Sequence, residues 1–285
     1  MIRRQKTFFL IVLFLLIVVG FLAAEWFTYD ASHLRVTFLD IGQGDAILLA
    51  RGSQEVLIDT GRDGSVLLAK LGATMPFWDR TIETVILTHP DQDHIGAFPA
   101  VANRYRIGTL LTTDATNDTA AWRSVETAIR DQNIRRLEAF AGDQMDFGDG
   151  ALLKVLFPVS HIDPHIKSTN DASIVTELHA GRDTFLFTGD LPSDKEPLVP
   201  IDGTIRILKA GHHGSKYSTG DAFLDRLRPE EAIISVGKNS YGHPSSETID
   251  RLLRHHVKIF RTDELGDIVY ECSLGESLCV RKGTF

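Results

Sequence analysis

The 285-residue sequence has no excess of positive charge and no internal repeat or low-complexity tract. Its 30 Lys and Arg residues are outnumbered by 38 Asp and Glu residues, and the formal net charge of −8 argues against a general basic face for nucleic acid. A phosphate substrate is not excluded, because bound divalent cations would reverse the local sign. With 43% apolar residues, the chain can bury one large core or two small ones.

Cysteine is nearly absent, and the two cysteines lie close together near the C-terminus. Cys272 and Cys279 flank the segment 274–277, Leu-Gly-Glu-Ser, which predicts a hairpin turn with two adjacent strands. A disulfide between them would fit an oxidising, extracytoplasmic compartment. Two free thiols are the alternative.

Charged residues are absent from 7–24, which are almost wholly apolar and follow a basic N-terminus. This length is just enough to cross a bilayer core as a helix, and the basic flank would place the N-terminus in the cytoplasm. We therefore expect residues 1–29 to form a membrane anchor with a short linker, and residues 30–285 to fold as one extracytoplasmic domain. A cleaved signal peptide, giving a secreted protein, is the alternative, but Phe21 and Leu22 stand where signal peptidase prefers small residues.

The most informative stretch follows the apolar run 84–87, which predicts a short buried strand. His89, Asp91, Asp93 and His94 come directly after it. In one loop, His89 and Asp91 could bind a first metal ion, and Asp93 and His94 a second. Imidazole and carboxylate ligands together suit zinc, manganese or iron. A surface loop rich in Asp and His is the alternative, but four potential ligands directly after a strand favour a metal site.

Three further predicted strands also end in potential ligands. Asp59 follows the strand 55–58, Asp190 follows 184–188, and the pair His212-His213 follows 205–210. Four separate strands ending in Asp or His are hard to reconcile with chance.

Together these motifs resemble those of the metallo-β-lactamase superfamily. More narrowly, four segments resemble the C-terminal hydrolase domain of ComEC competence proteins, over about residues 34–267. The segments are Phe38-Leu39-Asp40-Ile41-Gly42-Gln43-Gly44-Asp45-Ala46, Asn170-Asp171-x-Ser173, Gly211-His212-His213-Gly214-Ser215-Lys216 and Tyr241-Gly242-His243-Pro244. The resemblance implies an α+β fold, a four-layer αβ/βα sandwich with a binuclear metal site at one edge of two facing sheets.

The resemblance also implies ligands for two divalent metal ions, zinc or manganese. The first ion would be held by His89, Asp91 and Asp190, and the second by Asp93, His94, Asp190 and His212, with Asp190 bridging. Asp59 would orient a ligand histidine or the loop.

Two departures from the wider superfamily affect this assignment. Asp91 stands where many members have histidine, which makes the first site harder and could favour manganese. Asn170 and Asp171 occupy the region where many members supply another histidine, so both are candidates for a ligand or a supporting role. The choice between His212 and His213 also stays open, and we favour His212.

The metals would lower the pKa of a bridging water, which Asp93 is placed to orient. His243 could contact the substrate or protonate the leaving group. Alternatively, it is a turn residue before a helix capped by Ser245 or Ser246. The candidates for substrate binding, in glycine-containing loops, are Ser215, Lys216 and Lys238.

The resemblance implies a metal-dependent phosphodiesterase, a nuclease acting on DNA outside the cell membrane. A hydrolase of a small ester, lactam or lactone is the second hypothesis, because the same site serves many reactions. A non-catalytic binding module is the third, and the nearly complete ligand set argues against it. The family's polytopic channel region is missing from this sequence, so a separate DNA-channel protein is a candidate partner.

Overall fold

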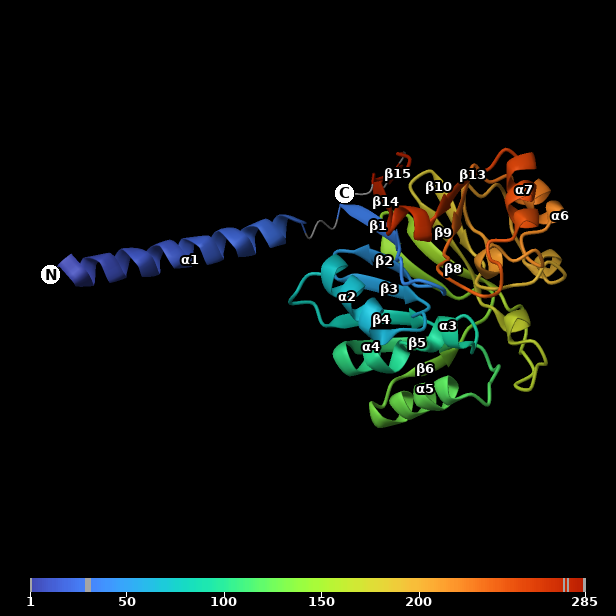
Figure 1. Ribbon diagram of the computed structural model, residues 1–285, viewed down its shortest axis with the longest axis horizontal. Helices are drawn as coiled ribbons and strands as arrows, with labels where there is room; N and C mark the ends of the chain where they lie inside the picture. Colours follow the sequence, from blue (N-terminus) through green and yellow to red (C-terminus); the bar gives the residue numbers. More distant parts are fainter. Residues whose placement is uncertain (1, 29–31, 274, 276, 284–285) are drawn as a thin grey trace.

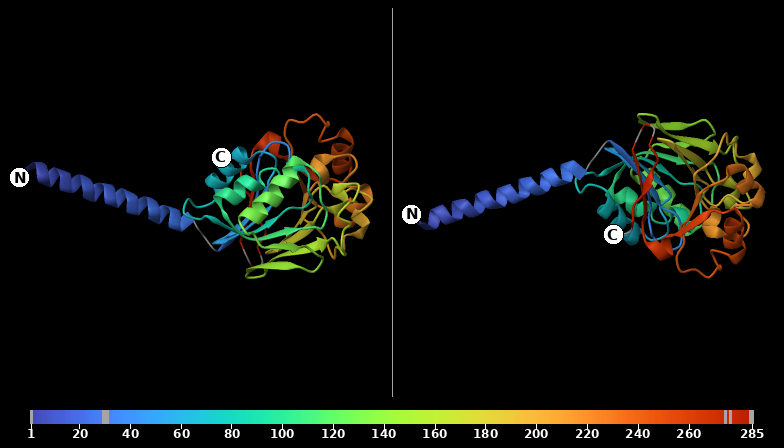
Figure 2. Two further views of the ribbon diagram at one scale, coloured as in Figure 1. Left: turned by 90° about the horizontal axis from the view of Figure 1, so that it is seen from below. Right: turned by 90° about the horizontal axis from the view of Figure 1, so that it is seen from above.

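The computed structural model describes residues 2–28, 32–273, 275 and 277–283, with the side chains of the first helix described from residue 5 to residue 21. Helix α1 (Ile2–Thr28) extends away from the globular part of the chain (Figures 1 and 2). Within the described ranges, no helix is long and apolar enough to cross a membrane. The predicted membrane span over residues 7–24 is not supported.

The first sheet combines strands from the N-terminal half of the domain with two strands from its C-terminal end. Its strands among the described residues are, in spatial order, β15 (Val280–Arg281), β14 (Ile268–Ser273), β1 (His33–Phe38), β2 (Ile47–Arg51), β3 (Gln54–Ile58), β4 (Thr81–Ile86), β5 (Arg106–Thr112) and β6 (Arg136–Glu138). The strands from β3 to β6 run parallel, and the other pairs are antiparallel. Strands β1, β2 and β3 thus form an antiparallel meander.

The second sheet faces the first. In the described part of the chain its order is β13 (Lys258–Arg261), β12 (Glu231–Ile234), β11 (Ile207–Lys209), β10 (Asp183–Phe187), β9 (Val175–Ala180), β8 (Ala151–Phe157) and β7 (Gln144–Gly148). The strands from β10 to β13 run parallel, whereas β7 to β10 are antiparallel. Each sheet thus has a parallel half, and the metal-ligand candidates follow strands of these two halves.

Helices cover the outer face of each sheet (Figure 1). The first sheet is covered by α2 (Gly64–Thr74), α4 (Phe98–Arg104) and α5 (Ala120–Asp131), and the second by α6 (Asp221–Leu227) and α7 (Ser246–Arg254). Short turns complete the chain: α3 (Gln92–Ile95), α8 (Thr262–Leu265), and the 3-10 helices η1 (Thr169–Ala172), η2 (Glu196–Leu198) and η3 (Gly211–Gly214).

Three apolar cores hold these layers together. Between the sheets, the ring of Phe38 lies 5.9 Å from that of Phe187 and 6.3 Å from that of Tyr270. The other cores lie under the helices on the outer faces, with Phe98 in one and Leu224 in the other. Burying each such side chain contributes roughly 1.5–3 kcal/mol. This layering confirms the predicted αβ/βα sandwich.

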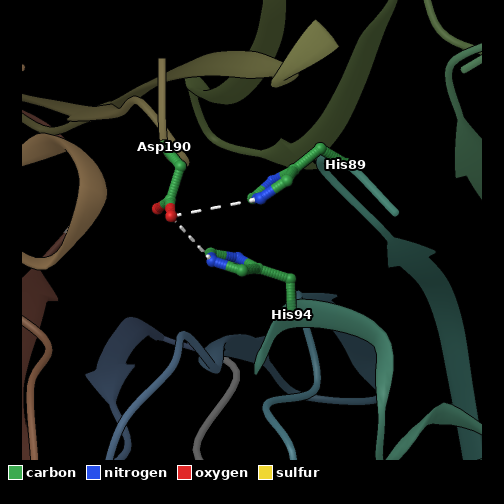
Figure 3. A group of neighbouring side chains, drawn as sticks. All are labelled: His89, His94 and Asp190. Carbon is green, nitrogen blue, oxygen red and sulfur yellow. Dashed lines mark ion pairs between the residues drawn. The ribbon is translucent and has the colours of Figure 1, made fainter. Parts of the chain in front are cut away.

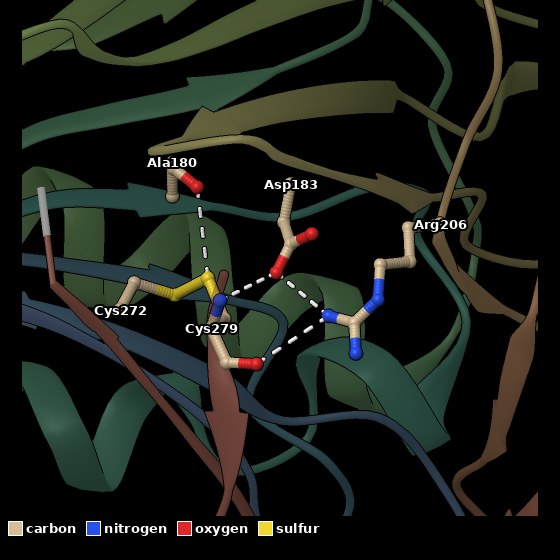
Figure 4. The surroundings of a disulfide bond; sticks show 5 residues. All are labelled: Ala180, Asp183, Arg206, Cys272 and Cys279. Carbon is tan, nitrogen blue, oxygen red and sulfur yellow. Dashed lines mark hydrogen bonds and ion pairs between the residues drawn. A yellow bond between two sulfur atoms is a disulfide. The ribbon is translucent and has the colours of Figure 1, made fainter. Parts of the chain in front are cut away.

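The C-terminal hairpin is also confirmed, and Cys272 and Cys279 form a disulfide (Figure 4). The amide of Cys279 donates to the carboxylate of Asp183, which also pairs with Arg206 at 2.6 Å. Asp183 begins β10 and Arg206 directly precedes β11, both in the second sheet. This contact therefore links the C-terminal hairpin of the first sheet to the second sheet.

The chain forms two short helices at and directly after the loop 88–94. Helix α3 begins inside the loop at Gln92, with Asp91 as its N-cap residue, and α4 follows from Phe98. The reason is that Pro99 suits the first turn of a new helix but would break the interior of a continuous one.

Candidate metal centre

The predicted ligands meet because they follow parallel strands. Asp59 follows β3 and the loop 88–94 follows β4, which pair in register through Ile58 and Ile86. Asp190 follows β10 and η3 follows β11 in the second sheet, where Phe187 pairs with Lys209. The carboxyl ends of parallel strands lie at one edge of a sheet, and the two edges face each other across the centre.

Asp190 faces both His89 and His94 (Figure 3). Its Oδ2 lies 3.3 Å from Nε2 of His94 and 4.0 Å from Nε2 of His89. The same oxygen lies 3.5 Å from Nε2 of His213 and 3.6 Å from Nε2 of His212. One carboxylate oxygen therefore faces imidazoles from both sheets, as the predicted bridging role of Asp190 requires.

The geometry favours His213 over the predicted His212 as the ligand that follows β11. Nε2 of His213 lies 3.5 Å from Oδ2 of Asp93, and the side chain is buried. His213, Asp93 and His94 also form a group whose ligand atoms all lie within 4.8 Å of one another. His212 is partly exposed, and its Nδ1 lies 3.3 Å from the amide nitrogen of Asn170. On this geometry His213 is the better candidate for the ligand, and His212 lies at the mouth of the centre.

Each buried histidine is held through Nδ1. Nδ1 of His94 donates to Asp59 at 2.7 Å, and Nδ1 of His213 donates to the carbonyl oxygen of Ser235 at 2.9 Å. The Thr88 hydroxyl gives its hydrogen to Asp59 and can therefore only accept from Nδ1 of His89, at 3.0 Å. These contacts fix the tautomers, so Nε2 of all three rings carries a lone pair directed to the centre.

The three Nε2 atoms are buried without a hydrogen-bond partner. Such orphaned acceptors are rare in folded proteins unless an ion or water satisfies them. Two or three imidazole nitrogens with carboxylate oxygens are the donor set that divalent transition metals take. The residues present therefore fit a metal centre.

The electrostatics favour positive charge at this point. Burial alone would lower the pKa of His213, but Asp190 and Asp45 raise it to about 9. Burial likewise opposes the shift at His94, yet Asp190 and Asp59 raise its pKa well above the ordinary value. A cluster that draws protons onto buried imidazoles would equally stabilise a cation bound in their place.

The two aspartates of the loop differ in surroundings. Burial opposes the shift at Asp93, but His213, whose Nε2 lies 3.5 Å away, and the charge of His94 lower its pKa below the ordinary range. Oδ1 of Asp91 accepts from Thr169 at 2.6 Å, while its Oδ2 lies 3.8 Å from Nε2 of His89. Asp91 is thus positioned at the outer side of the cluster, 34% exposed.

Sequence reasoning missed a buried ion pair directly behind the cluster. Lys209 is fully buried; its Nζ contacts a carboxylate oxygen of Asp45 and donates to the carbonyl oxygen of Gly189 at 3.0 Å. The same nitrogen lies 3.7 Å from Oδ1 of Asp190, the oxygen that faces away from the histidines. The sequence signal for this ion pair was Lys209 itself, a charged residue inside the predicted apolar strand 205–210.

Two other predicted residues lie outside the cluster. Asp171 forms an ion pair with Lys195 at 3.4 Å and does not approach the histidines within ligand distance among the groups described. In the same segment, Ser173 is the residue that contacts the cluster. Its Oγ lies 3.4 Å from Nδ1 of His89 and accepts from the amide of Asp190 at 3.1 Å. Ser215 is buried and accepts from the amide of Tyr217, which stabilises the turn after η3.

The remaining candidates lie in the loops that follow β11 and β12. Lys216 and Lys238 are exposed. The ring of His243 lies 5.2 Å from that of His212, and its Nδ1 is buried without a hydrogen-bond partner. Helix α7 does begin three residues later, at Ser246, and is capped by Ser245, so His243 also occupies the predicted turn.

Comparison with known proteins agrees with this architecture. The metallo-beta-lactamase superfamily profile matches residues 39–238. The chain is 33% identical over 267 residues to ComE operon protein 3 of Bacillus subtilis, covering 84% of this chain and 33% of that protein. It is 30% identical over 242 residues to Recombination protein 2 of Haemophilus influenzae, covering 82% of this chain and 28% of that protein. The chain thus spans about a third of the length of these curated relatives.

Among solved structures, the metallo-beta-lactamase fold protein YhfI from Bacillus subtilis aligns with a TM-score of 0.56 at 12% identity, covering 84% of this chain and 99% of that chain. This likeness shows the fold alone. Together with the profile match and the ComEC-like relatives, it establishes that the chain belongs to the metallo-β-lactamase superfamily.

Proposed function

We propose that the chain hydrolyses phosphodiester bonds of DNA with two divalent metal ions, zinc or manganese. The observation that carries the proposal is the convergence of three buried, unpartnered Nε2 atoms on the carboxylates of Asp93 and Asp190. The similarity to proteins named for competence and recombination supports DNA as the substrate.

The residues divide into two ligand groups. His89, Asp91 and Asp190 would hold one ion, and Asp93, His94, Asp190 and His213 the other. When bound, the ions supply Lewis-acid stabilisation of the phosphoryl oxygens and a nucleophile at neutral pH.

The chain's own residues orient the ligands and form hydrogen bonds around this centre. Asp59 keeps His94 in the tautomer that presents Nε2. Asp93, whose pKa is lowered, remains a carboxylate and can accept a hydrogen bond from the attacking water. Burial, followed by the neighbouring His212, lowers the pKa of His243, which leaves a neutral imidazole near pH 7. His243 is therefore better suited to donate a hydrogen bond to a substrate oxygen than to protonate the leaving group.

Substrate charge would be met at the mouth of the centre. Lys216 and Lys238 are exposed in the loops that follow β11 and β12, the loops that also carry His212 and His243. Two lysines in these loops would provide local positive charge in a chain of net charge −8. Phosphates of a polymer can be bound there without a basic face elsewhere.

The proposal is tested by following the full chain, stripped of metal and reloaded with manganese or zinc, with linear single- and double-stranded DNA. Metal-dependent cutting is expected, with a loss of at least about 100-fold in Asp93→Asn. Asp171→Asn is the matched control, because Asp171 faces Lys195 instead, and it should retain activity. A wild-type chain that binds two ions yet leaves both DNA forms intact would make a small ester or lactone the better substrate class.

We also propose an extracytoplasmic location, supported by the buried disulfide Cys272–Cys279. Structural disulfides persist in oxidising compartments and are rare in the cytosol. Alkylation of free thiols in intact cells should leave both cysteines unlabelled until a reductant is added. Labelling without reductant would contradict this location. A separate DNA-channel protein remains our proposed partner, to be sought by crosslinking in the producing cell.

A further inference from the structure

A single asparagine holds the loop that borders the metal centre between β12 and α7. Nδ2 of Asn239 donates to the carbonyl oxygens of Gly237 at 2.9 Å and His243 at 2.7 Å. Its Oδ1 accepts from the amides of Tyr241 at 3.0 Å and His243 at 3.1 Å. One side chain thus uses both donors and both lone pairs to fix residues 237–243 in one conformation.

The loop is fixed to the metal centre at both ends. At its start, a Cβ on Gly237 would lie 2.4 Å from the backbone of Gly42, so only glycine permits this approach to the loop that carries Asp45. At its end, the amide of Ser245 donates to the carbonyl oxygen of Gly214 in η3 at 2.9 Å. The loop is therefore rigidly positioned relative to the ligands.

The tip of this rigid loop presents a large aromatic ring to solvent. Tyr241 is 71% exposed. Its ring lies 5.9 Å from that of His243 at an interplanar angle of 32°, and His243 in turn lies 5.2 Å from His212. Nε2 of His212 is 3.6 Å from Asp190. A row of rings thus leads from solvent to the central carboxylate, and Lys238 lies exposed on the same loop.

We propose that Tyr241 is a stacking platform for an unpaired nucleobase, and that the preferred substrate is single-stranded DNA. The inference rests on the proposed phosphodiesterase function. An exposed, preorganised aromatic ring beside a cation is the arrangement that binds single strands without sequence preference. In a duplex the base faces are stacked on each other, so no base face is free to stack on the ring of Tyr241. Lys238 can meet the phosphate that follows the stacked base.

Tyr217 provides a matched control. It is 67% exposed on a neighbouring loop, but Lys216 lies over its ring with Nζ at 5.2 Å from the centroid. One face of that ring is therefore already covered by the chain itself, and it should not act as a platform.

The experiment compares kcat/KM of the full, manganese-loaded chain for three probes: a 12-mer of thymidylate, a 12-mer with the same backbone but abasic throughout, and a duplex of the same length. The wild type should prefer the thymidylate strand over the abasic strand by about 10-fold or more, since base–aromatic stacking has this size. Tyr241→Ala and Asn239→Ala should remove that preference through KM, while Tyr241→Phe and Tyr217→Ala retain it.

The outcomes separate the subsite from the underlying function. If Tyr241→Ala cuts the thymidylate strand as well as the wild type does, or if the wild type prefers the duplex, the platform is refuted while the phosphodiesterase stands. If the wild type cuts none of the three probes, the proposed function fails, and the platform fails with it.

Discussion

Replacing Lys209 with methionine should strongly destabilise the folded domain. Lys209 is fully buried and is the donor to one oxygen of Asp45 and to the carbonyl oxygen of Gly189. Without it, the cationic groups near Asp45 in the described part of the chain are His213 and His94, whose Nδ1 atoms at 3.5 Å and 3.9 Å are too far for good hydrogen bonds. Removing one partner of a buried pair in this way costs about 3–5 kcal/mol.

The free energy of unfolding is measured from urea transitions of metal-free protein followed by circular dichroism. Lys209→Met combined with Asp45→Asn should recover much of the loss, because no unpaired charge is then buried. Lys195→Met is the control: this lysine contacts Asp171 and Asp194 at the surface, so its loss should cost about 0–1 kcal/mol. A loss below about 1 kcal/mol in Lys209→Met would refute the reasoning.

Three further perturbations follow from the structure. Asp59→Asn removes the carboxylate that holds Nδ1 of His94 and should weaken metal binding about 10- to 100-fold without unfolding the protein. Metal affinity is measured by competition with a chelating dye, and an unchanged affinity would contradict the orienting role of Asp59. Burial, and then Glu83, raise the pKa of Glu55 to about 9. The folded state then holds a proton that the unfolded state releases, so the contribution of Glu55 to the free energy of unfolding is complete below about pH 4.5 and is lost progressively towards pH 9. Urea transitions of Glu55→Gln should therefore show a free energy of unfolding at least about 1 kcal/mol above that of the wild type at pH 8 and little difference at pH 4. An equal effect at both pH values would refute this. Reducing the disulfide should lower the free energy of unfolding by about 2–4 kcal/mol, measured with and without dithiothreitol, whereas no loss would show that the contacts around Asp183 suffice.

The strand-end ligands could be predicted because their signal is local. His89, Asp91, Asp93 and His94 are nearly contiguous and follow a clear apolar run, and Asp190 ends another such run. The choice between His212 and His213 could not be made, because both residues have positive φ, 50° and 53°, in a short 3-10 turn. Neither strand nor helix periodicity applies there, so spacing does not reveal which ring points inward.

The supporting residues behind the cluster depend on contacts between distant segments. Asp45 precedes β2 of the first sheet and Lys209 ends β11 of the second, so they meet only when the two sheets pack together. Asp171 was a plausible ligand by position, but the distant Lys195 pairs with it. Only the layered packing decides such pairings.

The central claim, that the converging imidazoles and carboxylates form a binuclear metal centre, is tested most directly by counting bound metal. The metal-free full chain would be dialysed to equilibrium against manganese and, separately, zinc, and its metal content determined by elemental analysis. We predict two ions per wild-type chain for at least one of the metals, and no more than one after His213→Ala. His212→Ala should retain both ions. One ion or fewer per wild-type chain with both metals would contradict the account.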